Sequence, residues 1–283
     1  MSEMDELKRV LDLEPIEENL FRGISTAEPT RRIFGGQVVA QALTAAYKTI
    51  GAGICHSLQS YFIRQGDPSR PVLYQVERSR DGRSFMTRRV IAIQKGEQIF
   101  NMACSFQLPE DGYDHQEAMP PAPPPLSVPD DDERWRAAFT NDPEALRRLD
   151  RPSPIELRQV DPVALRDPKP LAANQVVWVR ARGSLGEGIA VNQVLLAYAS
   201  DYSLLGTGMR PHGVNWLSGV QTASLDHILW FHRPTDFSKW HLYVMDSPSA
   251  SGARGFNRGL IYREDGVLVA SAAQEGLIRP PRR

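Results

Sequence analysis

Residues 35–50 read GGQVVAQALTAAYKTI, and this stretch decides the fold. Apolar and small side chains fall on nearly every side of a helix built from it, which is typical of a helix buried all round. Two glycines, Gly35 and Gly36, stand where this helix begins. Strand-like segments follow at residues 54–64, 72–79, 83–94 and 98–107. We therefore expect one buried helix packed against one curved antiparallel sheet.

The same pattern returns in the second part of the chain. Residues 191–205, VNQVLLAYASDYSLL, are again mostly apolar or small, and a glutamine again stands near the start. Strand-like segments follow at residues 222–232, 240–247, 254–263 and 267–275. The turn sequences QKGE and REDG occupy matching places in the two sets and are typical of hairpins. Because the repeat is far longer than a solenoid period, we predict an α+β protein made of two fused copies of one unit.

A proline-dense segment separates the two copies. It contains PPAPPP at residues 120–125 and the acidic run DDDE at residues 130–133. Proline is disfavoured in helix interiors and in central strands, so we predict a linker with short helices near residues 134–139 and 143–149. The expected organisation is a first unit at residues 1–108, a linker at 109–154 and a second unit at 155–283.

Composition narrows the classes of function. The chain has 33 basic and 34 acidic residues and a formal net charge of -1, which does not favour a nucleic-acid partner. No apolar run approaches the roughly 20 residues that span a bilayer, so we expect no membrane partner. Cys55 and Cys104 lie in apolar segments, and no metal-ligand spacing is present. The acidic start, Met1 to Glu6, is unlike a signal peptide, and we expect a cytoplasmic protein.

Several motifs resemble those of the type II acyl-CoA thioesterases. They occur in order as RRIFGGQVVAQA at 31–42, ASD at 199–201, SLDHILWFHRP at 224–234, SGARGF at 251–256 and QEG at 274–276. The resemblance covers nearly the whole chain, from Leu7 to about Ile278. It implies a double-hotdog fold and hydrolysis of medium- or long-chain fatty acyl-CoA to a free fatty acid and CoA. It also implies no cofactor or metal and a homo-oligomer, either a dimer or a tetramer of double hotdogs.

The resemblance assigns three catalytic residues, all in the second unit: Asp201, Ser224 and Gln274. The duplication supports two of them, since the first-unit counterparts fall near Ala45 and Phe106, so the fold itself needs neither polar group. Ser224 gains no such support because its counterpart is also a serine. Each residue also has an ordinary structural interpretation: a helix-end aspartate, a satisfied core amide and a strand serine bonded to the backbone.

The predicted mechanism is direct attack by water. Asp201 would accept the proton, and Ser224 and Gln274 would hold the water in line with the thioester carbonyl. No Gly-x-Ser-x-Gly elbow is present, which argues against a Ser-His-Asp site. Because a carboxylate alone activates a serine hydroxyl weakly, we expect no acyl-enzyme on Ser224. Backbone N–H groups at residues 186–190, where the second helix begins, would meet the oxyanion. Candidate contacts for the CoA phosphates are Arg64, Arg88 and Arg233.

Three histidine and acid residues near the motifs have structural explanations. Asp226 and His227 could orient each other, although a structural strand pair is the simpler explanation. His56 falls in the unit that lacks the acid, where we expect it to be structural or near the ligand.

Two other functions stay open. An enoyl-CoA hydratase on the same fold would need an Asp/His dyad in its own loop motif, which we do not find. An acyl-CoA-binding regulator would need a DNA-binding helix pair, and the first 30 residues are too short for one.

Overall fold

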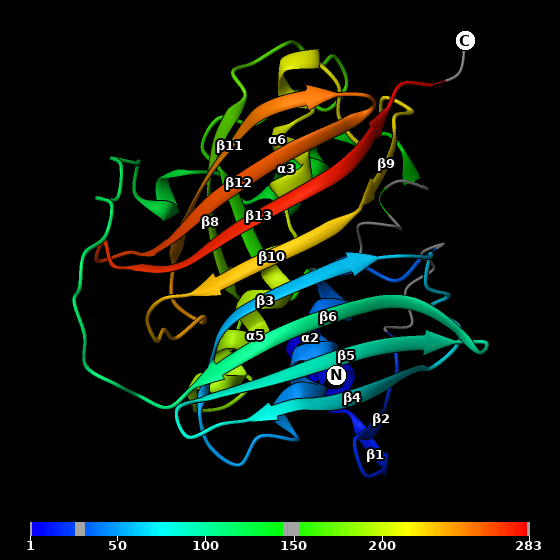
Figure 1. The fold of residues 1–283 in the computed structure, drawn as a ribbon. Helices are drawn as coiled ribbons and strands as arrows, with labels where there is room; N and C mark the ends of the chain where they lie inside the picture. Colours follow the sequence, from blue (N-terminus) through cyan, green and yellow to red (C-terminus); the bar gives the residue numbers. More distant parts are fainter. Residues whose placement is uncertain (1, 26–31, 144–145, 147–152, 282–283) are drawn as a thin grey trace.

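One continuous antiparallel sheet organises the molecule. The computed structural model describes residues 2–25, 32–143, 146 and 153–281. Within them, thirteen strands form a sheet in the order β1-β2-β4-β5-β6-β3-β10-β13-β12-β11-β8-β7, and β9 pairs with β13 beside this path. Helices α2 (Gly35–Tyr47) and α5 (Ile189–Ala199) lie against one face of the sheet (Figure 1). The α+β prediction is confirmed.

The first half follows the predicted order of strands. They are β1 (Glu14–Glu17), β2 (Leu20–Gly23), β3 (Ile54–Phe62), β4 (Val72–Asp81), β5 (Phe85–Gln94) and β6 (Glu97–Gln107). The β5–β6 hairpin turns at Lys95 and Gly96, whose φ angles of 53° and 76° are both left-handed, as this two-residue turn requires. The sequence did not reveal β1, β2 or the N-terminal helix α1 (Glu3–Leu11), which Ser2 and Asp5 cap.

The second half differs from the prediction at one strand. Its strands are β7 (Ile155–Gln159), β8 (Asn174–Ala181), β9 (Gln221–Ser224), β10 (Asp226–Phe231), β11 (His241–Ser251), β12 (Arg254–Arg263) and β13 (Leu268–Arg279). The single strand expected at 222–232 is interrupted at Leu225. Both parts pair with β13, and the N–H of Leu225 donates to Glu275 on that strand, but the Leu225 carbonyl accepts from Phe62, where pairing with β3 begins. Strands β7 and β8 were not predicted.

The second buried helix is shorter than the expected 191–205. Helix α5 ends at Ala199, and a separate short helix, α6 (Leu204–Thr207), follows. Ser203 between them has a φ of 65°, which a continuing helix does not allow. Asp201 therefore lies in a turn just beyond the helix.

The linker carries one of its two predicted helices within the described residues. Helix α3 (Asp131–Ala138) covers much of the range expected near 134–139, after the single turn η1 (Pro125–Ser127). Arg182, just after β8, donates to Asp130 at 2.9 Å and to Asp132 at 3.0 Å and so fixes the start of α3. Most of the second predicted helix, at 143–149, lies outside the described residues.

The two halves meet along β3 and β10, which run side by side in the middle of Figure 1. Their antiparallel register extends from Ser57 opposite Trp230 to Tyr61 opposite Asp226. In addition, the Ser60 hydroxyl donates to the backbone carbonyl of His227 at 2.8 Å. The two halves therefore pair through their sheets.

Helix α2 can be buried on all sides because the polar side chains within it form hydrogen bonds inside the protein. Ten of its residues are buried, including Gln41, which is 0% exposed. The Gln41 amide donates to the carbonyls of Val10 and Ile24 and accepts from the Tyr74 hydroxyl at 2.6 Å. Among the described residues, no helix is long and apolar enough to cross a membrane.

Helices α2 and α5 run antiparallel, so each end of one meets the opposite end of the other. The start of α2 meets the residues after α5 at what we name the Asp201 junction, where Gly36 contacts Asp201. The start of α5 meets the end of α2 at the Tyr47 junction, where Gln193 contacts Tyr47.

Candidate active site

The Asp201 junction depends on two glycines. A Cβ atom on Gly36 would lie 2.3 Å from the backbone oxygen of Tyr198, and one on Gly35 would lie 2.7 Å from a carboxylate oxygen of Asp201. Neither distance is possible for a real side chain. The glycines expected to favour tight helix packing therefore bring the first turn of α2 directly against the end of α5.

Asp201 accepts hydrogen bonds on both carboxylate oxygens. Oδ2 accepts from the Gly36 N–H at 2.9 Å, and Oδ1 accepts from the Gln274 amide at 2.7 Å and from the Ser224 hydroxyl at 3.4 Å. The Asp201 side chain is only 6% exposed. The helix N-terminus supplies an N–H and a favourable dipole for this charge. The structure thus brings the three predicted residues together around one carboxylate.

The three residues differ in their access to the cavity beside them. Asp201 and Ser224 line it, with Ser224 at the last position of β9. Gln274 lies behind them in the interior of β13 and is 0% exposed. Its Oε1 atom is buried and has no hydrogen-bond donor in the described part of the chain. Gln274 therefore contacts Asp201 and not the cavity.

His227 lies behind the same carboxylate and was assigned only a structural place from the sequence. It is 0% exposed, its Nδ1 is 3.2 Å from the Gln274 amide nitrogen, and its Nε2 is 2.8 Å from the Ser200 hydroxyl. Burial lowers the pKa of His227, and the charge of Asp201 opposes this in part. The sequence signal that could have found His227 and Ser200 is their place beside two proposed site residues in the motifs ASD and SLDH.

Asp226 and His227 do not orient each other. The Asp226 carboxylate accepts from the Glu275 N–H at 2.7 Å, and burial raises the pKa of Asp226. Because successive strand residues point to opposite faces of a sheet, the two side chains diverge. His56 belongs to the other half, where it contacts the Ser105 hydroxyl at 2.8 Å.

The cavity beside Asp201 has a volume of about 1220 Å³. Both halves line it, and α3 of the linker adds Arg134 and Trp135. Its apolar lining includes Ile33, Phe34, Val38, Phe62, Ile99, Phe100, Ile155, Leu157, Tyr198, Leu205 and Met209. A long apolar group and a polar head could both be accommodated in a space with this lining.

The expected oxyanion donors are not at this site. Residues 186–190 lie just before and at the start of α5, at the far end from Asp201 of a helix that is roughly 16 Å long at 1.5 Å per residue. None of them lines the cavity. The helix N-terminus beside Asp201 belongs to α2 instead. The prediction was wrong because it assumed that the acid and the oxyanion donors belong to the same half.

Of the three arginines proposed for CoA, only Arg64 lines the cavity. Arg88 is 2% exposed, and its guanidinium is bonded to Thr49 and Asp81. Arg233 bonds to the backbone of Leu268 and to Asp114. Arg32, which was not predicted, lines the cavity and donates to the carbonyl of Thr222 at 2.8 Å.

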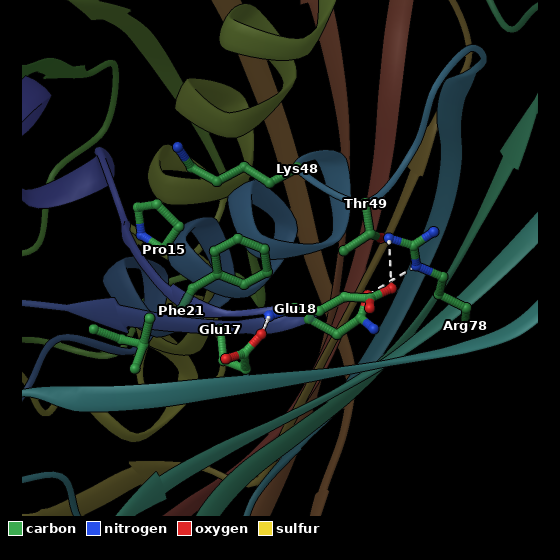
Figure 2. A pocket seen from close by; sticks show the side chains of 9 residues that line it. Pro15, Glu17, Glu18, Phe21, Lys48, Thr49 and Arg78 are labelled. Atoms are coloured by element: carbon green, nitrogen blue, oxygen red, sulfur yellow. Dashed lines mark hydrogen bonds and ion pairs between the residues drawn. The ribbon is translucent and has the colours of Figure 1, made fainter.

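A second, shallower hollow lies on the first half, between the β1–β2 hairpin and the end of α2 (Figure 2). It has a volume of about 360 Å³. Arg78 in it donates to Asn19 at 2.8 Å and lies 3.8 Å from Glu18. Arg78 and Glu18 are both exposed and pair with each other, so this hollow offers no buried, fixed charge of the kind found at Asp201.

Comparison with known proteins agrees with the motifs. The family model described as acyl-CoA thioesterase matches residues 155–277, and that of the acyl-CoA thioesterase N-terminal domain matches residues 25–107. Acyl-coenzyme A thioesterase 8 of Homo sapiens is 44% identical over 95% of this chain and 88% of its own.

Solved structures give the same result for the fold. The crystal structure of an acyl-CoA thioesterase II from Mycobacterium marinum has a TM-score of 0.78 at 39% identity and covers 97% of this chain and 98% of its own. A protein with a hot dog fold from Alicyclobacillus acidocaldarius also has a TM-score of 0.78, at 20% identity, covering 98% of both chains. The double-hotdog prediction is confirmed. Two family models, a close relative and a matching crystal structure agree with the motifs first read from the sequence, and the chain belongs to the type II acyl-CoA thioesterase family.

Proposed function

We propose that this protein hydrolyses medium- or long-chain fatty acyl-CoA to a free fatty acid and CoA by direct attack of water. The observation that carries the proposal is the Asp201 carboxylate, held by three hydrogen bonds at the wall of a largely apolar cavity. A fixed proton acceptor beside a space for an acyl chain is what thioester hydrolysis needs.

In the proposed reaction, a water molecule attacks the thioester carbonyl carbon while Asp201 accepts one of its protons. The carbonyl electrons move to oxygen and return as the carbon–sulfur bond breaks. The CoA thiolate leaves and takes up the proton that Asp201 had accepted, which restores the Asp201 carboxylate, and the carboxylic acid remains. No bond between the protein and the acyl group forms.

Ser224 and Gln274 divide the work in this proposal. Ser224 lines the cavity, and its hydroxyl oxygen can accept a hydrogen bond from the attacking water while it donates one to Asp201. Gln274 is buried behind Asp201, so its part is to hold the carboxylate and not the water. This division favours Ser224 as a water-holding residue and gives no support to a nucleophilic serine.

The developing oxyanion would meet the first turn of α2. Gly35 lines the cavity, and its backbone N–H has no acceptor among the residues that the structure describes. Because a helix N-terminus carries a partial positive charge, it stabilises an oxyanion there. The donor would thus come from the first half and the base from the second.

The cavity suggests where the two ends of the substrate bind. The apolar lining is suited to an acyl chain, and the exposed side chains of Arg32 and Arg64 can meet the phosphates of CoA. A series of acyl-CoA esters tests this part: kcat/KM for release of CoA thiol should rise from acetyl to palmitoyl. The highest value for acetyl-CoA would contradict the medium- or long-chain proposal.

Intact-protein mass spectrometry during rapid turnover of palmitoyl-CoA tests the mechanism. We expect no adduct of acyl mass, because the proposed route has no acyl-enzyme. An adduct on the peptide that contains Ser224, formed and lost at the catalytic rate, would replace direct hydrolysis with a covalent mechanism. Absence of CoA release from every acyl-CoA tested would remove the proposed activity altogether.

We also propose that the protein is a homo-oligomer, either a dimer or a tetramer. Tyr61 on β3 and Trp230 on β10 are 62% and 37% exposed and lie on the face of the sheet away from the helices. Exposed aromatic side chains at the centre of a sheet favour association. Light scattering coupled to size-exclusion chromatography should give at least twice the 31.7 kDa mass of the chain.

A further inference from the structure

His227 is completely buried, yet its two ring nitrogens both contact polar side chains. It lies on β10 at the position next to Ile228, which is opposite Ala273 on β13, and Gln274 follows Ala273. His227 and Gln274 therefore face each other across neighbouring strands. Beyond His227 lies Ser200, the residue that immediately precedes Asp201.

The directions of these hydrogen bonds follow from a single fixed acceptor. The Ser200 hydroxyl donates its only proton to the carbonyl of Ala197 at 3.0 Å, so it cannot also donate to His227. Its oxygen must then accept from His227, which places the ring proton on Nε2. The lone pair on Nδ1 is left to accept from Gln274. Ser200 thus selects the tautomer of His227.

The tautomer in turn selects the orientation of the Gln274 amide. One proton of the amide nitrogen goes to Nδ1 of His227 at 3.2 Å and the other to Oδ1 of Asp201 at 2.7 Å. The reversed amide would turn its carbonyl oxygen toward a carboxylate oxygen and an imidazole lone pair, and both contacts are repulsive. Oε1 is buried and unpaired, so within the described residues the Gln274 side-chain amide makes no hydrogen bond except these two.

We propose that Ser200 and His227 are positioning residues that hold the Gln274 amide with its N–H toward Asp201. The chain of contacts runs from the Ala197 carbonyl through Ser200, His227 and Gln274 to the carboxylate. Neither residue touches substrate. This inference rests on the proposed function, since it concerns the orientation of the same base.

Two substitutions of His227 separate positioning from packing. In His227→Asn, the side-chain oxygen takes the place of Nδ1 and can still accept the hydrogen bond from Gln274. The asparagine is too short to replace Nε2, so the hydrogen bond to Ser200 is lost. His227→Gln is closer in length and can still reach Ser200, but it presents a methylene group to Gln274. A merely structural role predicts that the longer glutamine is tolerated better.

The positioning role predicts the opposite order. His227→Gln should lower kcat about ten-fold, the equivalent of one hydrogen bond at the transition state, with KM changed by less than about two-fold. His227→Asn should stay within about three-fold of the wild-type kcat, although it removes ring atoms and should melt lower. The kcat of Ser200→Ala should fall between those of the two His227 variants. Without the Ser200 hydroxyl the ring proton of His227 is no longer held on Nε2, but Nδ1 is still present to accept from Gln274.

His232 offers a matched control. Its Nε2 also contacts a serine hydroxyl, that of Ser271, at 2.8 Å, but it lies outside the Asp201 junction. His232→Gln should leave kcat and KM unchanged. Equal losses in the two His227 variants, a smaller loss for glutamine than for asparagine, or a loss confined to KM would overturn the positioning role. A wild-type enzyme that releases no CoA would instead defeat the proposed function, so the two failures are distinguishable.

Discussion

At the Asp201 junction the first turn of α2 meets a carboxylate, whereas at the Tyr47 junction the first turn of α5 meets a phenol. The Tyr47 hydroxyl donates to Gln193 and accepts from the N–H of Cys55 at 2.9 Å. Gln193 also donates to the carbonyl of Cys55 at 2.8 Å, and the Tyr47 ring packs edge-on against Phe106 at 5.0 Å. Burial raises the pKa of Tyr47, which keeps it neutral.

The two junctions show how a duplicated scaffold can hold one site. In the first half, Ala45 and Phe106, near which the sequence places the counterparts of Asp201 and Gln274, are both 0% exposed. Aromatic packing and satisfied hydrogen bonds at the Tyr47 junction stabilise the helix pair. At the Asp201 junction, the same helix contact is used to hold a charge beside a cavity. One copy of the junction thus contributes packing, and the other is proposed to contribute chemistry.

The largest expected effect comes from removing the charge at the Asp201 junction. Asp201→Asn should keep the fold and substrate binding but lower kcat by roughly 10²–10⁴, the usual contribution of a general base. Steady-state release of CoA thiol measures this. Near-normal turnover would move the base elsewhere, and Asp226→Asn would be the next variant to examine.

Ser224 and Ser57 form a matched pair across the duplication. Ser224→Ala should lower kcat by about 10- to 100-fold, in the range of one to two transition-state hydrogen bonds, while Ser224→Thr should keep most activity. Ser57→Ala should cost little, because Ser57 lies on β3 away from Asp201. If the two alanine variants lose activity equally, both halves would contribute to catalysis and the comparison would fail.

Gly36→Ala should separate the helices at the Asp201 junction. Its Cβ would lie 2.3 Å from the carbonyl oxygen of Tyr198, so the start of α2 must move and its N–H must leave Asp201. We expect about a ten-fold loss of kcat and roughly 1–3 kcal/mol of stability, as for overpacking. Gly51→Ala is the control, because nothing lies within 4 Å of its added Cβ. Urea unfolding and turnover of both variants decide whether close approach is required.

The smallest effect on turnover is expected at the Tyr47 junction. Tyr47→Phe leaves the Cys55 N–H and the Gln193 oxygen without this partner, which should cost roughly 1–3 kcal/mol of stability. The kcat value should stay within about two-fold of wild type, because Asp201 is at the other end of the helices. A loss of turnover without a loss of stability would mean that the two junctions are coupled.

Local sequence patterns predicted most of the fold, because a short stretch is enough to show a helix that is apolar all round or a turn typical of a hairpin. Strand β12 was predicted at its observed limits, and α2 was predicted from its start. The interruption at Leu225 was not visible, since it arises where the chain, still paired with β13, gains β3 as a second neighbour. Strands β7 and β8 were missed because the proline-dense linker before them obscured where regular structure resumes.

The candidate site was predictable where a motif names a residue and unpredictable where packing brings residues together. Resemblance supplied Asp201, Ser224 and Gln274, which the structure brings together. It could not show that Gly36 donates to Asp201, because contact between residues 165 positions apart depends on the antiparallel packing of α2 and α5. Arg88 was misjudged for a similar reason: nothing local shows that its guanidinium is buried beside Thr49.

The seam between β3 and β10 has a consequence for how the chain is made. Strand β3 is complete at Phe62, but β10, which pairs with it, begins only at Asp226. At 5–20 residues per second, roughly 160 further residues take on the order of ten seconds to synthesise. During that time the future centre of the sheet is an exposed edge, with unpaired N–H and carbonyl groups that can template association with other chains. A strand that ends at the centre of the sheet is therefore an open edge for most of the time in which the second half is made.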